Sequence, residues 1–235
     1  MIVTRTRARY LSIAASVVLC GIILSGPVAV GLVEAFAPQP PWQDPSTFVQ
    51  HYSWLQTLPY VFGFLILGGF ILFMAGLTGA GREEERPFEM TAMGFTVVSA
   101  ALIFFNYVLQ TAFVPQSLQT DGGILAMVTM GNPRSLGWCL EMYGYGILGI
   151  ATAFAARLFG ASGRQKAIRF LLVANCIVSV VTAVLVPLIP GWLLTPVGWA
   201  AGAVWNLLIV VLMVLVIREF KFGKESKEVP KVHFV

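Results

Sequence analysis

The chain has 235 residues, of which 57% are hydrophobic and only 11% are charged, and its mean hydropathy is +0.82. An ordinary soluble domain carries roughly 25% charged residues, so this composition excludes a soluble enzyme, a disordered chain and a disulfide-stapled secreted domain. It predicts an all-α polytopic membrane protein. The net charge of +4 does not indicate nucleic-acid binding, because the basic residues are scattered over several segments.

Six apolar stretches predict six transmembrane helices in a single bundle, which makes residues 1–235 one domain. Each stretch is long enough to cross about 30 Å of hydrocarbon at 1.5 Å per residue. None shows the alternating polarity that is typical of a membrane β-strand. The predicted spans are residues 11–33, 55–78, 90–113, 136–158, 168–189 and 195–217.

The first span has some features of a cleaved signal peptide, because arginines precede it and small residues follow it. Its apolar run of about 23 residues is longer than the usual 7–15 of a secretory signal. We therefore expect a retained helix, bent at Pro27.

Basic residues predict the orientation. Fourteen of the 15 Lys and Arg fall before the first span, on alternate connections, or in the tail at 218–235, and only Arg134 falls on the other side. Positive charge stays cytoplasmic, so both termini, including this basic tail, are predicted to be inside. The layout resembles that of small six-helix bacterial inner-membrane proteins, in topology alone, and predicts a multi-pass protein of that membrane.

The two longer outer connections, residues 34–54 and 114–135, are expected to form a lid. Asp44 followed by Pro45 predicts the start of a short helix at the membrane interface. Asn132 and Pro133 predict the cap and first residue of the fourth transmembrane helix.

Glu141 is the one acidic residue that the predicted spans enclose. A carboxylate inside the membrane costs about 3 kcal/mol on insertion scales, so it needs a partner or a role. Asn106 lies at the same expected depth, roughly 8 Å outward from the middle of its span. Gln110 shares a helix face with Asn106, and Tyr145 shares one with Glu141, since each pair is four residues apart.

These positions predict an outward-facing binding pocket beneath the two outer loops. Its expected residues are Glu141, Asn106, Gln110, Tyr145, Tyr107 and Trp138, with Arg134 and His51 at the mouth. A second interpretation stays open, in which Glu141 bonds Asn106 and a tyrosine only to hold two helices together.

Other polar and small residues predict helix packing. Asn175 and Asn206 are expected to form interhelical hydrogen bonds. Gly198 and Gly202 form a GxxxG pattern, which predicts a close approach of two helices within the chain or in a homo-oligomer.

Several kinds of chemistry lack the residues they need. His51 and His233 lie at opposite predicted sides of the membrane, which argues against a paired-His haem or a His-based metal site. The three cysteines are isolated, so a thiol–disulfide relay is not expected. We expect no cofactor and no metal, and we assign no catalytic residue.

Three functions follow from these patterns. The first is binding or transport of a small amphiphilic or lipid-like molecule around Glu141. The second is an interaction subunit that docks another membrane protein. The third is a membrane-embedded enzyme that uses Glu141 and a tyrosine as acid and base.

Overall fold

The computed structural model describes residues 4–119, 122–161, 163–189 and 191–222. Six helical segments are long and apolar enough to cross a membrane, so the protein is a multi-pass membrane protein, and the described residues contain no strand. The spanning segments are Arg5–Phe36, Trp54–Leu77, Glu83–Gln116, Leu136–Leu158, Gly163–Leu188 and Pro196–Lys221.

All six predicted spans are confirmed, but four of the helices are longer than predicted. The first begins at Arg5 rather than near residue 11, and the third begins at Glu83 rather than near residue 90. The charged residues at these ends are compatible with a helix although they are not compatible with hydrocarbon. Hydropathy therefore locates the part of each helix that lies in lipid, and the helix continues into the interface.

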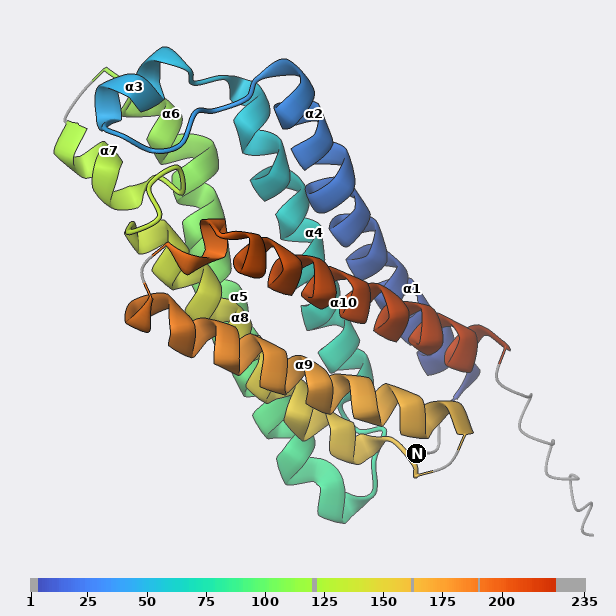
Figure 1. Ribbon diagram of the computed structural model, residues 1–235. Helices are drawn as coiled ribbons and strands as arrows, with labels where there is room; N and C mark the ends of the chain where they lie inside the picture. The colour runs from blue at the N-terminus through green and yellow to red at the C-terminus, as the bar shows by residue number, and fades with distance from the viewer. Residues whose placement is uncertain (1–3, 120–121, 162, 190, 223–235) are drawn as a thin grey trace, which may run out of the picture.

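The main helices form a ring in chain order (Figure 1). Each packs against the next, and the last closes on the first. In sequence they are α1 (Arg5–Ile23), α4 (Leu58–Leu77), α5 (Arg86–Val108), α8 (Leu136–Ala155), α9 (Gly163–Leu188) and α10 (Pro196–Phe222). Because neighbours run antiparallel, the ring has two ends. We call the end where α1 begins the basic end, and the end that carries the two long connections the loop end.

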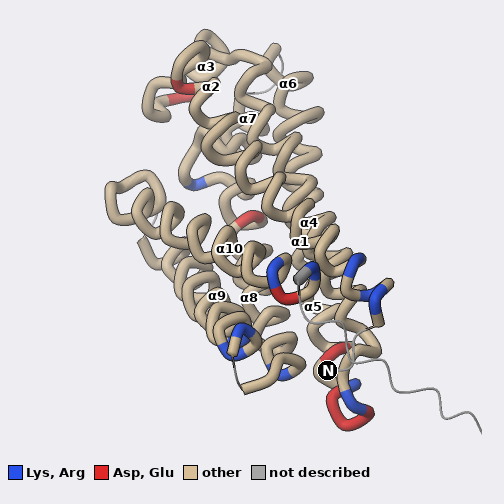
Figure 2. The backbone as a smooth tube through the Cα atoms, turned by 90° about the vertical axis from the view of Figure 1, so that its right-hand side faces the viewer, with Lys and Arg blue, Asp and Glu red and all other residues tan. Residues whose placement is uncertain are grey.

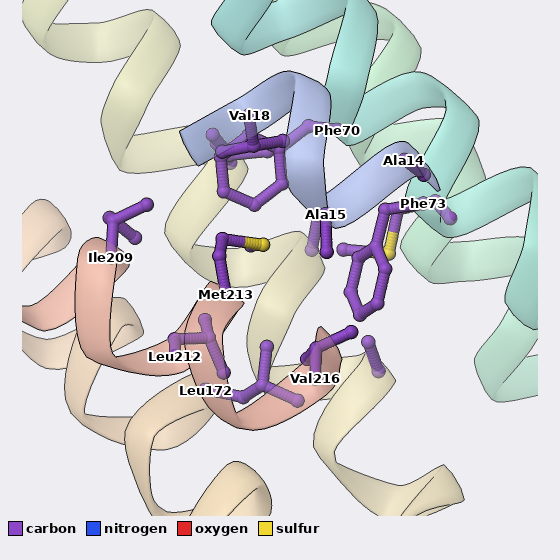
Figure 3. Close-up of a cluster of buried hydrophobic side chains, with 14 of the residues drawn as sticks. Ala14, Ala15, Val18, Phe70, Phe73, Leu172, Ile209, Leu212, Met213 and Val216 are labelled. Carbon is purple, nitrogen blue, oxygen red and sulfur yellow. The ribbon is translucent and has the colours of Figure 1, made fainter. Parts of the chain in front are cut away.

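Apolar side chains fill the ring at its basic half (Figure 3). Phe70 and Phe73 of α4 are fully buried there, between α1 and the second half of α10. On α1 the buried positions recur every three or four residues, which is the spacing of one helix face. The labelled core residues are Ala14, Ala15, Val18, Phe70, Phe73, Leu172, Ile209, Leu212, Met213 and Val216.

Glycines let α1 and α4 approach closely. A Cβ added to Gly69 would lie 2.8 Å from the backbone nitrogen of Val18, and one added to Gly21 would lie 2.8 Å from that of Ile66. Small residues at such contacts are the usual way for membrane helices to gain packing area.

The close helix approach within the chain predicted for the GxxxG of α10 is wrong, and the homo-oligomer alternative stays a prediction. A Cβ added to Gly202 would meet nothing within 4 Å, and Gly198 faces the backbone of its own connection at Trp192 and Leu193. Asn206 donates to the Gly202 carbonyl of the same helix at 2.9 Å, so it gives no interhelical bond among the interactions described. The pattern fails because this half of α10 borders a cavity rather than a helix.

Two π-helical segments interrupt the spanning helices at the loop half. The first, η1 (Leu24–Val28), contains Pro27 and leads into α2 (Ala29–Phe36). The second, η4 (Leu109–Phe113), leads into α6 (Val114–Gln116). Pro27, where a bend is predicted, lies in a π-helical segment, and proline removes an amide donor from the helical ladder.

The two loop-end connections pack on each other. The first carries α3 (Pro45–Gln50), and the second carries α7 (Gly122–Val128). Phe48 of α3 is buried in a small apolar cluster with Leu125 and Val128 of α7. The predicted cap at Asn132 is wrong. Ser135 caps α8 instead, because its side chain accepts from the Trp138 amide.

The basic end collects most of the described Lys and Arg (Figure 2). α10 continues through residue 222, so the first part of the predicted tail is helical, and the remainder lies outside the described residues. One acidic residue here was not expected to be buried. Glu89 in the first turn of α5 is only 4% exposed and accepts from the amides of Gly79 and Gly81 at 2.6 and 2.7 Å.

Replacing Glu89 tests whether it holds the connection between α4 and α5. Glu89→Ala leaves two backbone amides without their carboxylate, which should lower the free energy of unfolding by about 2–3 kcal/mol. Glu84→Ala is the matched control, because the Glu84 side chain is 80% exposed. Thermal unfolding in detergent micelles measures both. Equal stability of the two variants would contradict the assignment.

The α3 cap should depend on pH. Hydrogen bonds from Ser46 and from the Thr47 amide and side chain hold the pKa of Asp44 below its ordinary value of 3.8. The cap therefore stabilises α3 fully above that ordinary value, and the stabilisation is lost as the pH falls through the lower folded value. Hydrogen exchange at the Thr47 amide should show this loss in the wild type. An equal pH profile in Asp44→Asn, which keeps a neutral acceptor, would refute it.

Candidate functional site

Glu141 lies in the first half of α8, about 8 Å along the helix from its beginning at Leu136. Its Oε2 accepts a hydrogen bond from the Asn106 amide of α5 at 2.9 Å. The side chain is half-buried, because part of its surface borders a cavity. The structure thus brings together the two residues that the sequence placed at the same depth.

The side-chain amides of Asn106 on α5 and Gln110 on η4 support this carboxylate and also hold the second connection. Asn106 is fully buried. Gln110 donates to the Asn106 oxygen at 3.1 Å and to the Val128 carbonyl at 2.9 Å, and it accepts from the Met130 amide at 3.0 Å. Both amides are therefore occupied by protein partners, so their role is to position Glu141 and the segment after α7.

Tyrosines complete the cluster around Glu141. The hydroxyls of Tyr107 and Tyr145 lie 3.1 Å apart, and Tyr107 also interacts with Glu141. Tyr60 of α4 packs against Tyr107, with ring centroids 5.8 Å apart. The Trp205 ring of α10 meets the Tyr145 ring edge-on, with ring centroids 4.8 Å apart. Residues of four helices thus converge on one carboxylate.

The other predicted site residues have different positions. Trp138 lines the cavity, and its indole donates to the Met130 carbonyl at 2.8 Å. Arg134 and His51 are exposed, and neither is among the described residues that line the cavity, so the structure does not bring them to the site. Both lie on connections that contribute other residues to the lining, such as Tyr52 and Gly131.

Sequence reasoning missed Tyr60 and Trp205. Tyr60 lies toward the predicted outer surface of its span, where an aromatic residue is typical of the interface belt, and Trp205 lies near the middle of the sixth span. Comparing the depths of residues within their predicted spans, as for Asn106 and Glu141, places Trp205 near the level of Tyr145. This comparison does not show that the two side chains meet.

A second polar row runs from the cavity toward the basic end. The Trp205 indole donates to Ser179 at 3.2 Å, Ser179 donates to Asn175 at 3.3 Å, and Asn175 donates to Thr152 at 3.0 Å. The interhelical bond predicted for Asn175 is therefore confirmed. The row ties α8, α9 and α10 together.

The cavity has a volume of about 890 Å³ and occupies the loop half of the ring. Its walls come from all six spanning segments and from both loop-end connections. The described lining residues include two carboxylates, Glu34 and Glu141, and no Lys, Arg or His. The eight aromatic residues among them are Phe48, Tyr52, Tyr60, Tyr107, Trp138, Tyr145, Trp199 and Trp205.

The donor set does not suit a metal ion. Within the described ranges there is no group of three His, Cys, Asp or Glu residues that would hold one. Glu141 has amide and phenol neighbours instead. The arrangement offers the Glu141 carboxyl group as an acceptor beside apolar and aromatic cavity walls.

Gly63 of α4 makes room for the Tyr107 ring, which gives a test of the cluster. A Cβ at Gly63 would lie 2.5 Å from Tyr107 Cε2, and Tyr60 and Phe64 restrict movement of that ring. Gly63→Ala should therefore lower the free energy of unfolding by about 1–3 kcal/mol. Gly68→Ala, on the same helix with nothing within 4 Å, is the control. Thermal unfolding should separate the two variants, and equal stability would contradict this packing.

Comparison of the sequence with models of known families, with curated proteins and with solved structures gives no match. The chemistry of the site itself is therefore the basis for assigning a function.

Proposed function

We propose that the protein binds a small amphiphilic, lipid-like molecule in the loop-half cavity, with the polar end of the molecule at Glu141, as a binding or transport protein. One observation carries the proposal. A carboxylate held by neutral partners lies inside a cavity of about 890 Å³ whose other walls are mainly apolar and aromatic. Ligand pockets commonly have volumes of about 300–1,000 Å³, apolar walls and a few converging polar groups.

The distribution of packing favours a chamber over a continuous pore. At the basic half, fully buried side chains such as Phe70, Phe73 and Leu212 occupy the middle of the ring. The empty volume is at the loop half. A ligand that enters there meets the core beneath it, so a transport cycle would require the α1–α4–α10 packing to rearrange.

The wall of the cavity between α2 and α10 is where a ligand would enter from the lipid. Residues on both sides of this wall line the cavity and are solvent-accessible, such as Val30 and Trp199, with 37% and 60% of their surface exposed. The α9–α10 hairpin diverges from α2 and the α3–α7 cap at this end (Figures 1 and 2). An amphiphile would enter sideways through this wall and would not have to cross the packed connections.

The proposed orientation follows the distribution of positive charge. The basic end carries the described Lys and Arg other than Arg134, which favours a cytoplasmic basic end and an outward-facing cavity. The ligand would then come from the outer leaflet of the membrane.

The contact between Glu141 and Asn106 also joins α8 to α5, as the alternative interpretation of Glu141 requires. A helix–helix contact alone needs no neighbouring cavity, and a shared face of two helices is filled more cheaply by apolar side chains. The chamber beside the carboxylate supports a binding role in addition to this contact. The interaction-subunit and enzyme hypotheses remain predictions.

Filling the cavity should remove a bound molecule without unfolding the protein. Gly202 borders the cavity, and a Cβ added there meets nothing within 4 Å. Native mass spectrometry of protein released from nanodiscs should show a defined adduct on the wild type that is lost in Gly202→Leu, which blocks the space, and in Glu141→Gln, which removes the charge. Gly94→Leu, at an equally open glycine of α5 outside the lining set, should keep the adduct.

The same spectra can overturn the proposal. Bare wild-type protein, after incubation with a total lipid extract, would leave the cavity without a ligand. An adduct that persists at full occupancy in Gly202→Leu would place the ligand elsewhere. Thermal unfolding of each variant shows whether a lost adduct is instead due to lost structure.

A further inference from the structure

We propose that the molecule bound in the cavity carries a positive charge, so that the site is specific for lipophilic cations such as organic ammonium or phosphonium ions. This inference rests on the proposed function and names the class of its ligand. Its first basis is the charge of the lining. Glu34 and Glu141 are the ionisable acids among the described lining residues, and no basic residue is among them.

The charge of Glu141 has no cationic partner among the described interactions. Its neighbours are the Asn106 amide and the Tyr107 hydroxyl, which are neutral donors. The ion pairs of the described chain involve Arg82 and Arg164, both at the basic end. An anion within the membrane is costly without compensation. A cationic ligand would supply this compensation at the half-buried side of the carboxylate.

The second basis is the hydrogen-bonding capacity that the walls leave free. Apart from the Trp199 indole, the side-chain amide and indole groups at the cavity already donate to protein acceptors. Gln39 donates to Gln56 and to the Phe48 carbonyl, and Gln56 donates to two backbone carbonyls. Gln110, Trp138, Trp205 and Asn206 also donate to protein atoms. An anionic headgroup would therefore find few free N–H donors, whereas a cation needs none.

Aromatic faces are the third basis. Tyr60, Tyr107, Tyr145 and Trp205 surround the region next to Glu141, and all four line the cavity. The negative face of an aromatic ring attracts a cation by about 0.5–2 kcal/mol, most strongly where water is excluded. Aromatic rings around a carboxylate are a common chemical environment for an organic ammonium group.

Glu34 places a second negative charge on the entry side. It lies near the end of α2, is exposed, and lines the cavity at the wall through which a ligand would enter. Two carboxylates along one path make the whole path attractive to cations and repulsive to anions. Anionic phospholipids are thus disfavoured both at the entrance and at the inner end of the cavity.

Two hydrophobic ions of the same shape and opposite charge test the inference directly. Tetraphenylphosphonium and tetraphenylborate are titrated into the full-length protein in phosphatidylcholine nanodiscs, with tryptophan fluorescence as the readout and empty nanodiscs as the blank. We expect saturable binding of the phosphonium and at least about tenfold weaker binding of the borate. Glu141→Gln should weaken phosphonium binding by about tenfold or more, while Glu84→Gln, at the basic end, should leave it unchanged.

The outcomes separate this inference from the proposed function. Equal or tighter binding of the borate, or unchanged phosphonium binding in a folded Glu141→Gln variant, would overturn the cation assignment. If the native mass spectrum then shows a neutral or anionic adduct that Gly202→Leu removes, the cavity still binds an amphiphile and only its charge class is wrong. If neither ion binds and no adduct appears, both proposals fail. Phosphonium binding that Gly202→Leu abolishes in a folded protein supports both.

Discussion

Close packing of α1 against α4 and α10 at the basic half is the contact on which the rest of the structure depends. The six helices form a ring in which each packs against its neighbours, and the space in the middle of the ring has to be filled by side chains. At the basic half, glycines on α1 and α4 bring the backbones together, and large side chains occupy the remaining space. Two π-helical segments, at Leu24–Val28 and Leu109–Phe113, interrupt the spanning helices at the loop half. The cavity is the space that remains between the spanning helices at the loop half, where the large side chains of the core are absent.

Glu141 is placed by this arrangement and not by its own sequence neighbours. Its position on α8 faces inward, its distance from the end of α8 sets its depth, and the Asn106 amide, itself bonded by Gln110, holds it in one orientation. Gln110 also bonds the backbone at Val128 and Met130, so the carboxylate and the cover of the cavity share supports. This coupling means that a change in the cover would be felt at Glu141 through Gln110 and Asn106.

The sequence predicts the six spans and the Asn106–Glu141 pair, because hydropathy and depth along a helix are local properties. What the sequence does not predict depends on which residues face each other across the ring. Gly198 and Gly202 have the spacing of a packing motif, yet within the described chain no atom lies within 4 Å of a Cβ added to Gly202. Glu89 lies one residue outside the predicted third span, and it is buried where it accepts hydrogen bonds from two turn amides. Tyr60 and Trp205 come from helices other than those of Asn106 and Glu141, and they reach the site because four helices converge there.

The separation of the packed half from the hollow half has a consequence for how this chain can vary. Stability comes mainly from side chains such as Phe70, Phe73 and Leu212, which lie away from the cavity. Positions such as Gly202 and Ala203 of α10 border open space and support no neighbouring helix. Exchanges at these wall positions would reshape the chamber at little cost to folding. Related chains, or designed ones, can therefore keep this scaffold and change its selectivity.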